Sequence, residues 1–246
     1  MPIVLFTDFG SADLYVGQVK AVLARRAPRM PVLDALHDVP DFGIEPAAHL
    51  LCALTTEYPR GSVFLCVVDP GVGGARGAIV VEAGGRIFVG PDNGLLSVIW
   101  QRARRRKCFR IEWRPHRLTG SFHGRDLFAP VAAALAIKRL PRGWLAAKNS
   151  PDVLLAPDDL ARVIYVDHYG NCVTGVRATK VARSARIRAA GRLLRHARAF
   201  DEAQGPFWYE NSMGLVEIAA PRSSAARLLR LRVGTAVNIY STRIAR

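Results

Sequence analysis

The sequence has neither the long apolar run of a membrane protein nor the closely spaced cysteines of many secreted proteins. No apolar stretch among its 246 residues approaches the roughly 18–20 residues that a membrane helix needs. Its beginning, MPIVLFTDFG, has no basic leader of the kind that directs export. The four cysteines are scattered without CxxC spacing, and we interpret them as reduced thiols. These absences predict a cytoplasmic protein that does not contact a membrane.

Metal-binding spacings and nucleotide-binding loops are missing as well. The 6 histidines form no HxH or HExxH pattern and do not cluster with cysteine, so we expect no metal. The stretch GVGGAR lacks the GK[ST] ending of a Walker loop, and its glycines do not follow GxGxxG before a helix. The sequence therefore does not predict a phosphate-binding loop there.

Negative charge is scarce, since 20 acidic residues face 35 basic ones and leave a net charge of +15. A basic excess raises nucleic acid as a partner. The densest basic run lies at residues 102–107, but the other arginines are spread through both halves, with few aromatics between them to stack bases. We interpret the charge as a solvated basic face and do not expect a nucleic-acid partner.

Strands and helices alternate in the first part of the sequence. Apolar runs rich in β-branched residues indicate strands, and longer stretches with an apolar face indicate helices. The alternation predicts an α/β domain over residues 1–148 with a mainly parallel sheet. In chain order, the expected elements are strand 3–7, helix 13–26, strand 32–35, helix 45–58, strand 63–68, a hairpin of strands 78–82 and 86–89, and helices 95–101 and 125–137.

The composition changes beyond residue 140. Proline and aspartate punctuate the segment 149–157, which predicts a linker. The short apolar runs that follow predict a smaller all-β, barrel-like domain over residues 158–246. Its expected strands are 162–166, 172–176, 185–189, 215–219 and 236–242, with one helical turn at 224–231.

Residues 67–76, VVDPGVGGAR, place a carboxylate directly after a strand that the pattern predicts to be buried. Open α/β sheets bind their ligands at the carboxyl ends of strands, where Asp69 is expected. The glycines let the chain turn back, so that Arg76 can face Asp69 and hold it ionised. A turn with a purely structural salt bridge explains the same pattern.

A histidine precedes an expected helix in the stretch SFHGRD. Flanked by glycine, His123 can reach a cleft and move protons near neutral pH. Alternatively, Arg125 and Asp126 cap the helix, and His123 is a loop residue with satisfied hydrogen bonds. His37 and Asp38 form a second candidate pair.

Other polar groups follow strands in both halves. Asp8 and Asp13 come after the first strand, where a carboxylate can accept from both hydroxyls of a ribose or can cap the next helix. In the second half, an asparagine can read an adenine edge and a tyrosine can stack on the ring, although a Gly-Asn turn is the simpler explanation. Together these groups predict a polar ligand shared by the two domains; the candidates in the second half are Asp167, Tyr169, Asn171, Ser212 and Glu217.

The motifs occur in one order over nearly the whole chain: TDFGSADLYVGQVK, HDVP, VVDPGVGGAR, FVGPDNGLL, FHGRDLFAPVAAALA, VDHYGN and NSMGLVEIA. In these blocks the sequence resembles the S-adenosyl-L-methionine (SAM) hydrolases, also called SAM hydroxide adenosyltransferases, which are related to the fluorinases and chlorinases. The resemblance implies an α/β domain, a β-barrel-like domain, and a homotrimer with ligand sites between subunits. It implies attack of a water-derived hydroxide on the ribose C5′ of SAM, giving adenosine and L-methionine without a metal or organic cofactor.

The resemblance also implies roles at the matching positions. Asp69, Arg76 and His123 match an Asp-Arg-His set that the family's hydrolases carry and its halogenases lack, and they would orient and activate the water. Tyr169 stands where the family usually has phenylalanine, which preserves stacking, and Gly175 stands where asparagine is common. The implied substrate contacts are Asp8 with the ribose hydroxyls, Asn171 with adenine, Asp13 and Asp167 with the methionine ammonium, and Ser212 and Glu217 closing the nucleoside site.

Two other functions stay open on the sequence. A SAM-dependent halogenase is disfavoured by the intact Asp-Arg-His set and by the short segment 167–171, which is longer in the fluorinase. A non-catalytic protein that binds nucleosides or nucleic acid would account for the charge. SAM is itself a cation, so a net charge of +15 does not attract it, and the carboxylates in the cleft must reverse the field locally.

Overall fold

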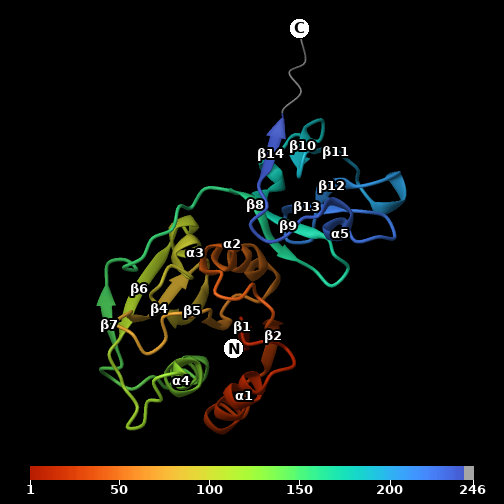
Figure 1. Cartoon of the computed structure of the whole chain (residues 1–246). Helices are drawn as coiled ribbons and strands as arrows, with labels where there is room; N and C mark the ends of the chain where they lie inside the picture. Colours follow the sequence, from red (N-terminus) through yellow and green to blue (C-terminus); the bar gives the residue numbers. More distant parts are fainter. Residues whose placement is uncertain (241–246) are drawn as a thin grey trace. The chain divides into compact units, whose positions relative to one another are not determined.

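Residues 1–240 are described by the computed structural model, which divides into two compact units (Figure 1). The first unit is Met1–Pro157, and the second begins at Asp158. The segment 149–157, expected as a linker, belongs to the first unit. There the backbone N–H of Asp152 donates to the buried carboxylate of Asp92 over 2.9 Å. Each unit has its own seven-stranded sheet.

The sheet of the first unit is mixed, with the strand order β2-β1-β3-β5-β4-β6-β7. Strands β2, β1, β3 and β5 run parallel, whereas β4, β6 and β7 join by antiparallel pairing. The predicted mainly parallel sheet is therefore correct for only half of the strand pairs, because β6 and β7 were not foreseen. The strands are β1 Ile3–Thr7, β2 Val32–Leu36, β3 Val63–Val67, β4 Ala78–Ala83, β5 Arg86–Pro91, β6 Arg106–Ile111 and β7 Leu145–Lys148.

Helices cover both faces of this sheet (Figure 1). Helix α1 packs against α4 on one face, and α2 packs against α3 on the other. The carboxylate of Asp13 accepts from the backbone N–H of Leu14 and so begins α1. No helix within residues 1–240 is both long enough and apolar enough to cross a bilayer. The helices are α1 Leu14–Arg26, α2 Ile44–Leu54, the 3₁₀ turn η1 Thr55–Glu57, α3 Ser97–Arg102, the π-helical turn η2 Gly124–Phe128 and α4 Ala129–Ala136.

The two central strands position the candidate site. Every residue of β1 and β3 is buried, since helices cover both faces, and this explains their unbroken apolar sequences. Each fully buried large apolar side chain contributes about 1.5–3 kcal/mol. The strands are parallel and pair Thr7 with Val67, so both end at the same edge of the sheet. The polar residues that follow them, Asp8 and Asp69, therefore leave the sheet side by side.

The second unit is a nearly closed, barrel-like sheet with the order β14-β10-β11-β12-β13-β9-β8. An antiparallel bridge from Arg162 to Ala236 links the two outer strands, which confirms the predicted barrel-like character. The expected strand 236–242 corresponds to β14, and its last two residues lie outside the described residues. The elements are β8 Leu160–Val166, β9 Cys172–Arg177, η3 Ala178–Lys180, β10 Arg186–Ala189, β11 Arg192–His196, η4 Phe200–Glu202, β12 Phe207–Glu210, β13 Leu215–Ala219, α5 Ala225–Leu229 and β14 Val237–Tyr240.

Candidate active site

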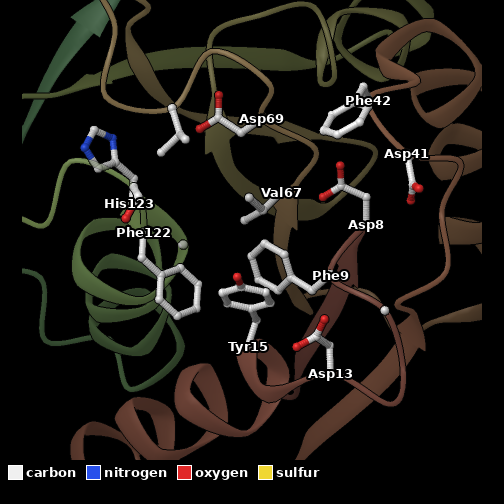
Figure 2. Close-up of a pocket in the computed structure, with 14 residues that line it drawn as sticks. Asp8, Phe9, Asp13, Tyr15, Asp41, Phe42, Val67, Asp69, Phe122 and His123 are labelled. Atoms are coloured by element: carbon white, nitrogen blue, oxygen red, sulfur yellow. The ribbon is translucent and has the colours of Figure 1, made fainter.

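A cavity of about 450 Å³ opens at the carboxyl ends of β1 and β3 (Figure 2). Asp8 and Asp69 line it, and Asp13 and His123 join them from the start of α1 and from the turn before η2. Four of the sequence-predicted site residues therefore meet in one cavity of the first unit. Because ligands of open α/β sheets bind at this edge, the cavity is the candidate active site.

Arg76 joins the carboxylate and the histidine of this cavity. Its Nε donates to Asp69 Oδ1 over 2.9 Å, and its Nη2 donates to Asp69 Oδ2, which makes a two-pronged ion pair. The same Nη2 donates to His123 Nδ1 over 2.9 Å. The Asp69 side chain is only 3% exposed and that of Arg76 11%, so the pair is largely shielded from water. The predicted Asp69–Arg76 contact is present, and His123 completes it.

The environment of His123 favours the neutral form of its imidazole. Burial lowers the pKa of His123 below the usual 6.5, and the neighbouring Arg76 guanidinium lowers it further. An arginine can only donate, so Nδ1 must be the accepting nitrogen, and the proton of the neutral ring is on Nε2. His123 therefore presents an N–H donor rather than a free lone pair.

The loops that carry these residues touch through two glycines. Gly73 has φ +79, and a Cβ built on it would lie 2.3 Å from the carbonyl oxygen of Gly120. A side chain at residue 73 would thus push apart the loop that carries Arg76 and the loop that carries His123. Arg125 and Asp126, the alternative helix cap, pair over 2.6 Å at the start of η2.

A turn after β5 holds both ends of the 69–77 loop. Nδ2 of Asn93 donates to the carbonyl of Val68 over 2.8 Å, one residue before the carboxylate. The N–H of Asp92 donates to the carbonyl of Gly77 over 3.0 Å, one residue after the arginine. The block FVGPDNGLL contains this turn, but backbone carbonyls leave no side-chain signal, so sequence reasoning did not find its role.

The rest of the cavity combines carboxylates with an aromatic wall (Figure 2). Burial raises the pKa of Asp8, and the neighbouring charge of Asp41 adds to this effect. Phe9, Tyr15 and Phe122 contact one another with ring centroids 5.3–5.9 Å apart and form one side. The sequence did not single out these rings or Asp41, because such residues occur equally in ordinary cores and loops.

The second unit groups three of its five predicted residues. Asp167, Tyr169 and Asn171 line one hollow of about 710 Å³, with Tyr209 among its other walls. Asn171 donates to the Asp167 carboxylate from its backbone N–H and from Nδ2, over 2.8 and 2.9 Å. Tyr169 is 75% exposed, so its ring is available for stacking.

Ser212 and Glu217 do not line that hollow. Ser212 lines a different hollow of the second unit. Glu217 is buried, and its two oxygens accept from Tyr209 Oη over 2.5 Å and from Asn211 Nδ2 over 2.8 Å. Burial raises the pKa of Glu217. Glu217 therefore orders Tyr209, which lines the hollow of Asp167, and Asn211, which lines the hollow of Ser212.

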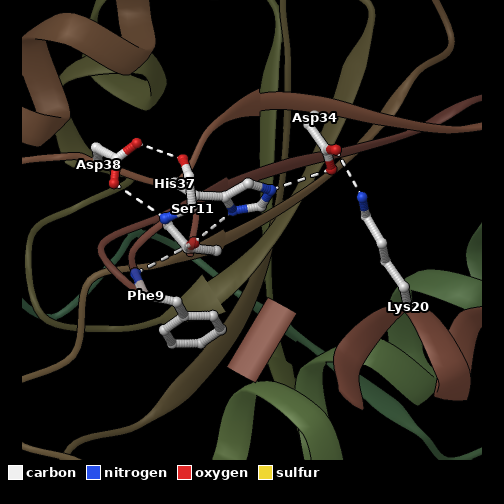
Figure 3. Close-up of polar contacts among 7 residues, drawn as sticks. Phe9, Ser11, Lys20, Asp34, His37 and Asp38 are labelled. Atoms are coloured by element: carbon white, nitrogen blue, oxygen red, sulfur yellow. Dashed lines mark hydrogen bonds and ion pairs between the residues drawn. The ribbon is translucent and has the colours of Figure 1, made fainter. Parts of the chain in front are cut away.

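The second candidate pair, His37 and Asp38, makes hydrogen bonds with neighbouring parts of the first unit (Figure 3). The His37 ring contacts Thr7 Oγ1 over 2.8 Å and Asp34 over 3.0 Å, and Asp34 in turn pairs with Lys20 over 2.6 Å. Asp38 accepts from the backbone N–H of Ser11 over 3.0 Å. His37 therefore connects β1 and β2, Asp38 holds the loop at Ser11, and neither lines the cavity.

Within residues 1–240, no three histidine, cysteine or acidic side chains are grouped so as to hold a metal ion.

The family model of the SAM hydroxide adenosyltransferase N-terminal domain matches residues 3–142, and that of the C-terminal domain matches residues 161–238. The chain belongs to the SAM hydroxide adenosyltransferase family. The resemblance inferred from the ordered motifs is thereby confirmed.

Individual relatives agree with this assignment. An "(R)-S-adenosyl-L-methionine hydrolase" of Thermus thermophilus is 38% identical over 97% of this chain and 99% of its own length. A fluorinase of Actinopolyspora mzabensis is 24% identical, over 97% of both chains. Among solved structures, an uncharacterized conserved protein from Thermotoga maritima has a TM-score of 0.87 at 31% identity, covering 97% of this chain and 100% of that one.

Proposed function

We propose that the protein hydrolyses SAM to adenosine and L-methionine. The observation that carries the proposal is the contact of Arg76 with both Asp69 and His123 at the wall of an acidic cavity. A water oxygen attacks the ribose C5′, the C5′–S bond breaks, and the sulfur leaves with the bonding electrons as the neutral thioether of methionine. Because the leaving group is good, the protein needs mainly to orient one water in line with the C5′–S bond and accept its proton.

His123 and Asp69 have different parts in this step. The Nε2 proton of His123 donates to the water oxygen and fixes its position, since Nδ1 is occupied by Arg76. Each oxygen of Asp69 accepts from Arg76 and retains a second lone pair for water. We therefore assign the proton of the attacking water to Asp69. Arg76 aligns the other two groups and does not itself transfer a proton.

The cavity suits a cationic substrate although the whole chain is basic. Its described lining contains four carboxylates and neither lysine nor arginine. Asp8, placed beside Asp69 at the strand ends, is positioned to accept from the ribose hydroxyls, and Asp13 stands on the cavity wall nearest α1. Local negative charge thus outweighs a net charge of +15 that is screened over roughly 8–10 Å in salt.

Product analysis tests the reaction. The purified protein is incubated with the R and S epimers of SAM in ¹⁸O-labelled water, with and without chloride or fluoride, and the products are separated by chromatography. We expect adenosine labelled at the 5′ oxygen without halide, and methionine in equal amount. A 5′-halonucleoside would identify a halogenase, unlabelled adenosine would exclude attack at C5′ by water, and absence of turnover would leave a binding protein.

Two variants test the assigned roles. His123→Gln and Asp69→Asn should each lower kcat by about 10²–10⁴-fold, because each removes a group that handles the water. The matched control is His37→Gln, which alters a histidine outside the cavity and should keep kcat within about twofold if it folds. Unchanged turnover in both site variants would refute the assignment.

We further propose that the active species is a homotrimer without metal or organic cofactor, working in the cytoplasm. Its sites combine the cavity of one copy with Asp167, Tyr169, Asn171, Ser212 and Glu217 of another. Mixing inactive Asp69→Asn with inactive Asn171→Ala should then restore activity, because some assembled sites contain neither change. Failure of the mixture after confirmed subunit exchange, or a fully active monomer in analytical ultracentrifugation, would contradict shared sites.

A further inference from the structure

A basic hollow of about 720 Å³ lies at the opposite edge of the first unit's sheet from the cavity. Strand β5 starts at Arg86 beside the start of β3, because the parallel register pairs Val63 with Ile87. Asp69 comes after the other end of β3, about five strand residues or roughly 17 Å away. Six cations line the hollow against one carboxylate, Glu82; they are Arg60, Arg86, Arg104, Arg105, Arg106 and Lys107.

Two of these arginines are held side by side by one backbone oxygen. Arg60 Nη1 and Arg86 Nη1 each donate to the carbonyl of Gly84 over 3.3 Å. The next residue, Gly85, leaves room for this arrangement, since a Cβ there would lie 2.4 Å from Arg60 Nη2. Burial and the charge of Arg60 both lower the pKa of Arg86. Arg86 also donates from Nε to the carbonyl of Tyr58 and from Nη2 to that of Thr56, and these bonds hold its guanidinium in place. The turn thus fixes two like charges close together, and their repulsion favours a bound anion.

The other cations leave this charge uncompensated. Glu82 is the lone acidic group in the described lining, and it lies 3.8 Å from Lys107. Arg106 donates to backbone carbonyls, the shortest bond being 2.8 Å to that of Gln101, and it pairs with no carboxylate within the described residues. Arg104 and Arg105 are exposed and make no hydrogen bond or ion pair within residues 1–240. Both are free to close over a bound anion.

We propose that this hollow binds a compact anion with at least two adjacent phosphoryl groups, such as an inorganic polyphosphate or a nucleoside polyphosphate. The unpaired guanidinium forks of the adjacent Arg104 and Arg105 match phosphoryl oxygens two at a time, and neighbouring forks favour neighbouring phosphates over a single carboxylate. The described lining has no aromatic ring on which bases could stack, which favours a small polyanion over a nucleic-acid strand. The site is separate from the acidic cavity, so it does not depend on the proposed hydrolysis.

Calorimetric titration with inorganic tripolyphosphate tests the proposal. Arg104→Ala/Arg105→Ala removes the two free arginines and should weaken binding about tenfold, since two exposed ion pairs contribute up to about 1 kcal/mol each. The matched control, Arg25→Ala/Arg26→Ala in the last turn of α1, removes the same charge elsewhere and should change the Kd less than about twofold. Thermal unfolding verifies that both variants fold.

Further ligands separate the sources of the phosphates. Equal affinity for ATP and tripolyphosphate means that the phosphate chain alone is recognised, whereas tighter ATP binding assigns a contribution to the nucleoside. The proposal is overturned if tripolyphosphate does not bind, or if both double variants weaken it equally through net charge. Binding of a 20-nucleotide single strand without tripolyphosphate binding would overturn it in favour of a nucleic-acid surface.

Discussion

The contact between Gly73 and Gly120 allows a sharp test of how the site is assembled. Gly73→Ala adds one methyl group at a left-handed position, φ +79, which costs an L residue roughly 1–2 kcal/mol. The new Cβ would lie 2.3 Å from the Gly120 oxygen, whereas an ordinary carbon–oxygen contact is about 3.3 Å. The two loops must therefore separate by about 1 Å.

That displacement moves Arg76 and Asp69 relative to His123. Misplacement of catalytic groups by about 1 Å costs on the order of 10²-fold in rate, so we expect kcat of Gly73→Ala to fall about 10²-fold. KM should change little, because Asp8 and Asp13 come from other elements of the cavity. The free energy of unfolding, measured in urea, should fall by about 1–3 kcal/mol.

Gly120→Ala is the matched control on the other side of the same contact. A Cβ on Gly120 meets nothing within 4 Å, so kcat should stay within about twofold of the unaltered protein. Steady-state kinetics on SAM and urea unfolding measure both variants. Full activity of Gly73→Ala would refute the coupling of the loops, and equal damage in both variants would point to lost flexibility rather than close approach.

Four further predictions concern the surroundings of the site and the buried network of the second unit. Asn93→Ala frees the Val68 carbonyl and should lower kcat about 10-fold at constant KM, unlike Asn149→Ala on the surface; a matching drop in the control would count against the clamp. Because burial and Arg76 lower the pKa of His123, kcat should hold as the pH falls through 6.5 and drop only below it, and Arg76→Gln should move this limb to higher pH. Below pH 6.5 the unfolded chain binds a proton at His123 more readily than the folded protein does. The free energy of unfolding should therefore also fall as the pH falls through that range, and urea titrations at each pH measure it. Glu217→Gln leaves one accepting oxygen where Tyr209 and Asn211 both donate, so one of the two loses its acceptor, and it should cost about 1–3 kcal/mol in unfolding; a cost below that of Tyr209→Phe would contradict the buried network.

The candidate site was easier to predict than the sheet that supports it. Buried parallel strands have unbroken apolar sequences, so β1 and β3 and the carboxylates after them could be located from the sequence. The strand β6 begins with Arg106 and Lys107 and is exposed at several positions, so its sequence resembles that of a charged loop. Its partner β7 has only four residues, too few for a periodic pattern.

Other parts depend on contacts that no local pattern contains. The motif NSMGLVEIA marks Glu217 as polar beside a strand, but Tyr209 and Asn211 take up both of its oxygens. Asp13 shows the reverse case, because its carboxylate both caps α1 and lines the cavity. For Asp13, capping the helix and facing the ligand cavity are therefore compatible, although the sequence presented them as alternatives.

The charges of the first unit follow the direction of its parallel strands. Carboxylates gather where β1 and β3 end, and arginines gather where β3 and β5 begin. A net charge of +15 therefore describes neither region, since each hollow has its own field over distances near the Debye length. The cation and the anion that we propose as ligands are compatible with binding to the same unit, because the strand length separates their sites by about two Debye lengths at physiological salt. Basic composition is consequently no argument against SAM as the substrate.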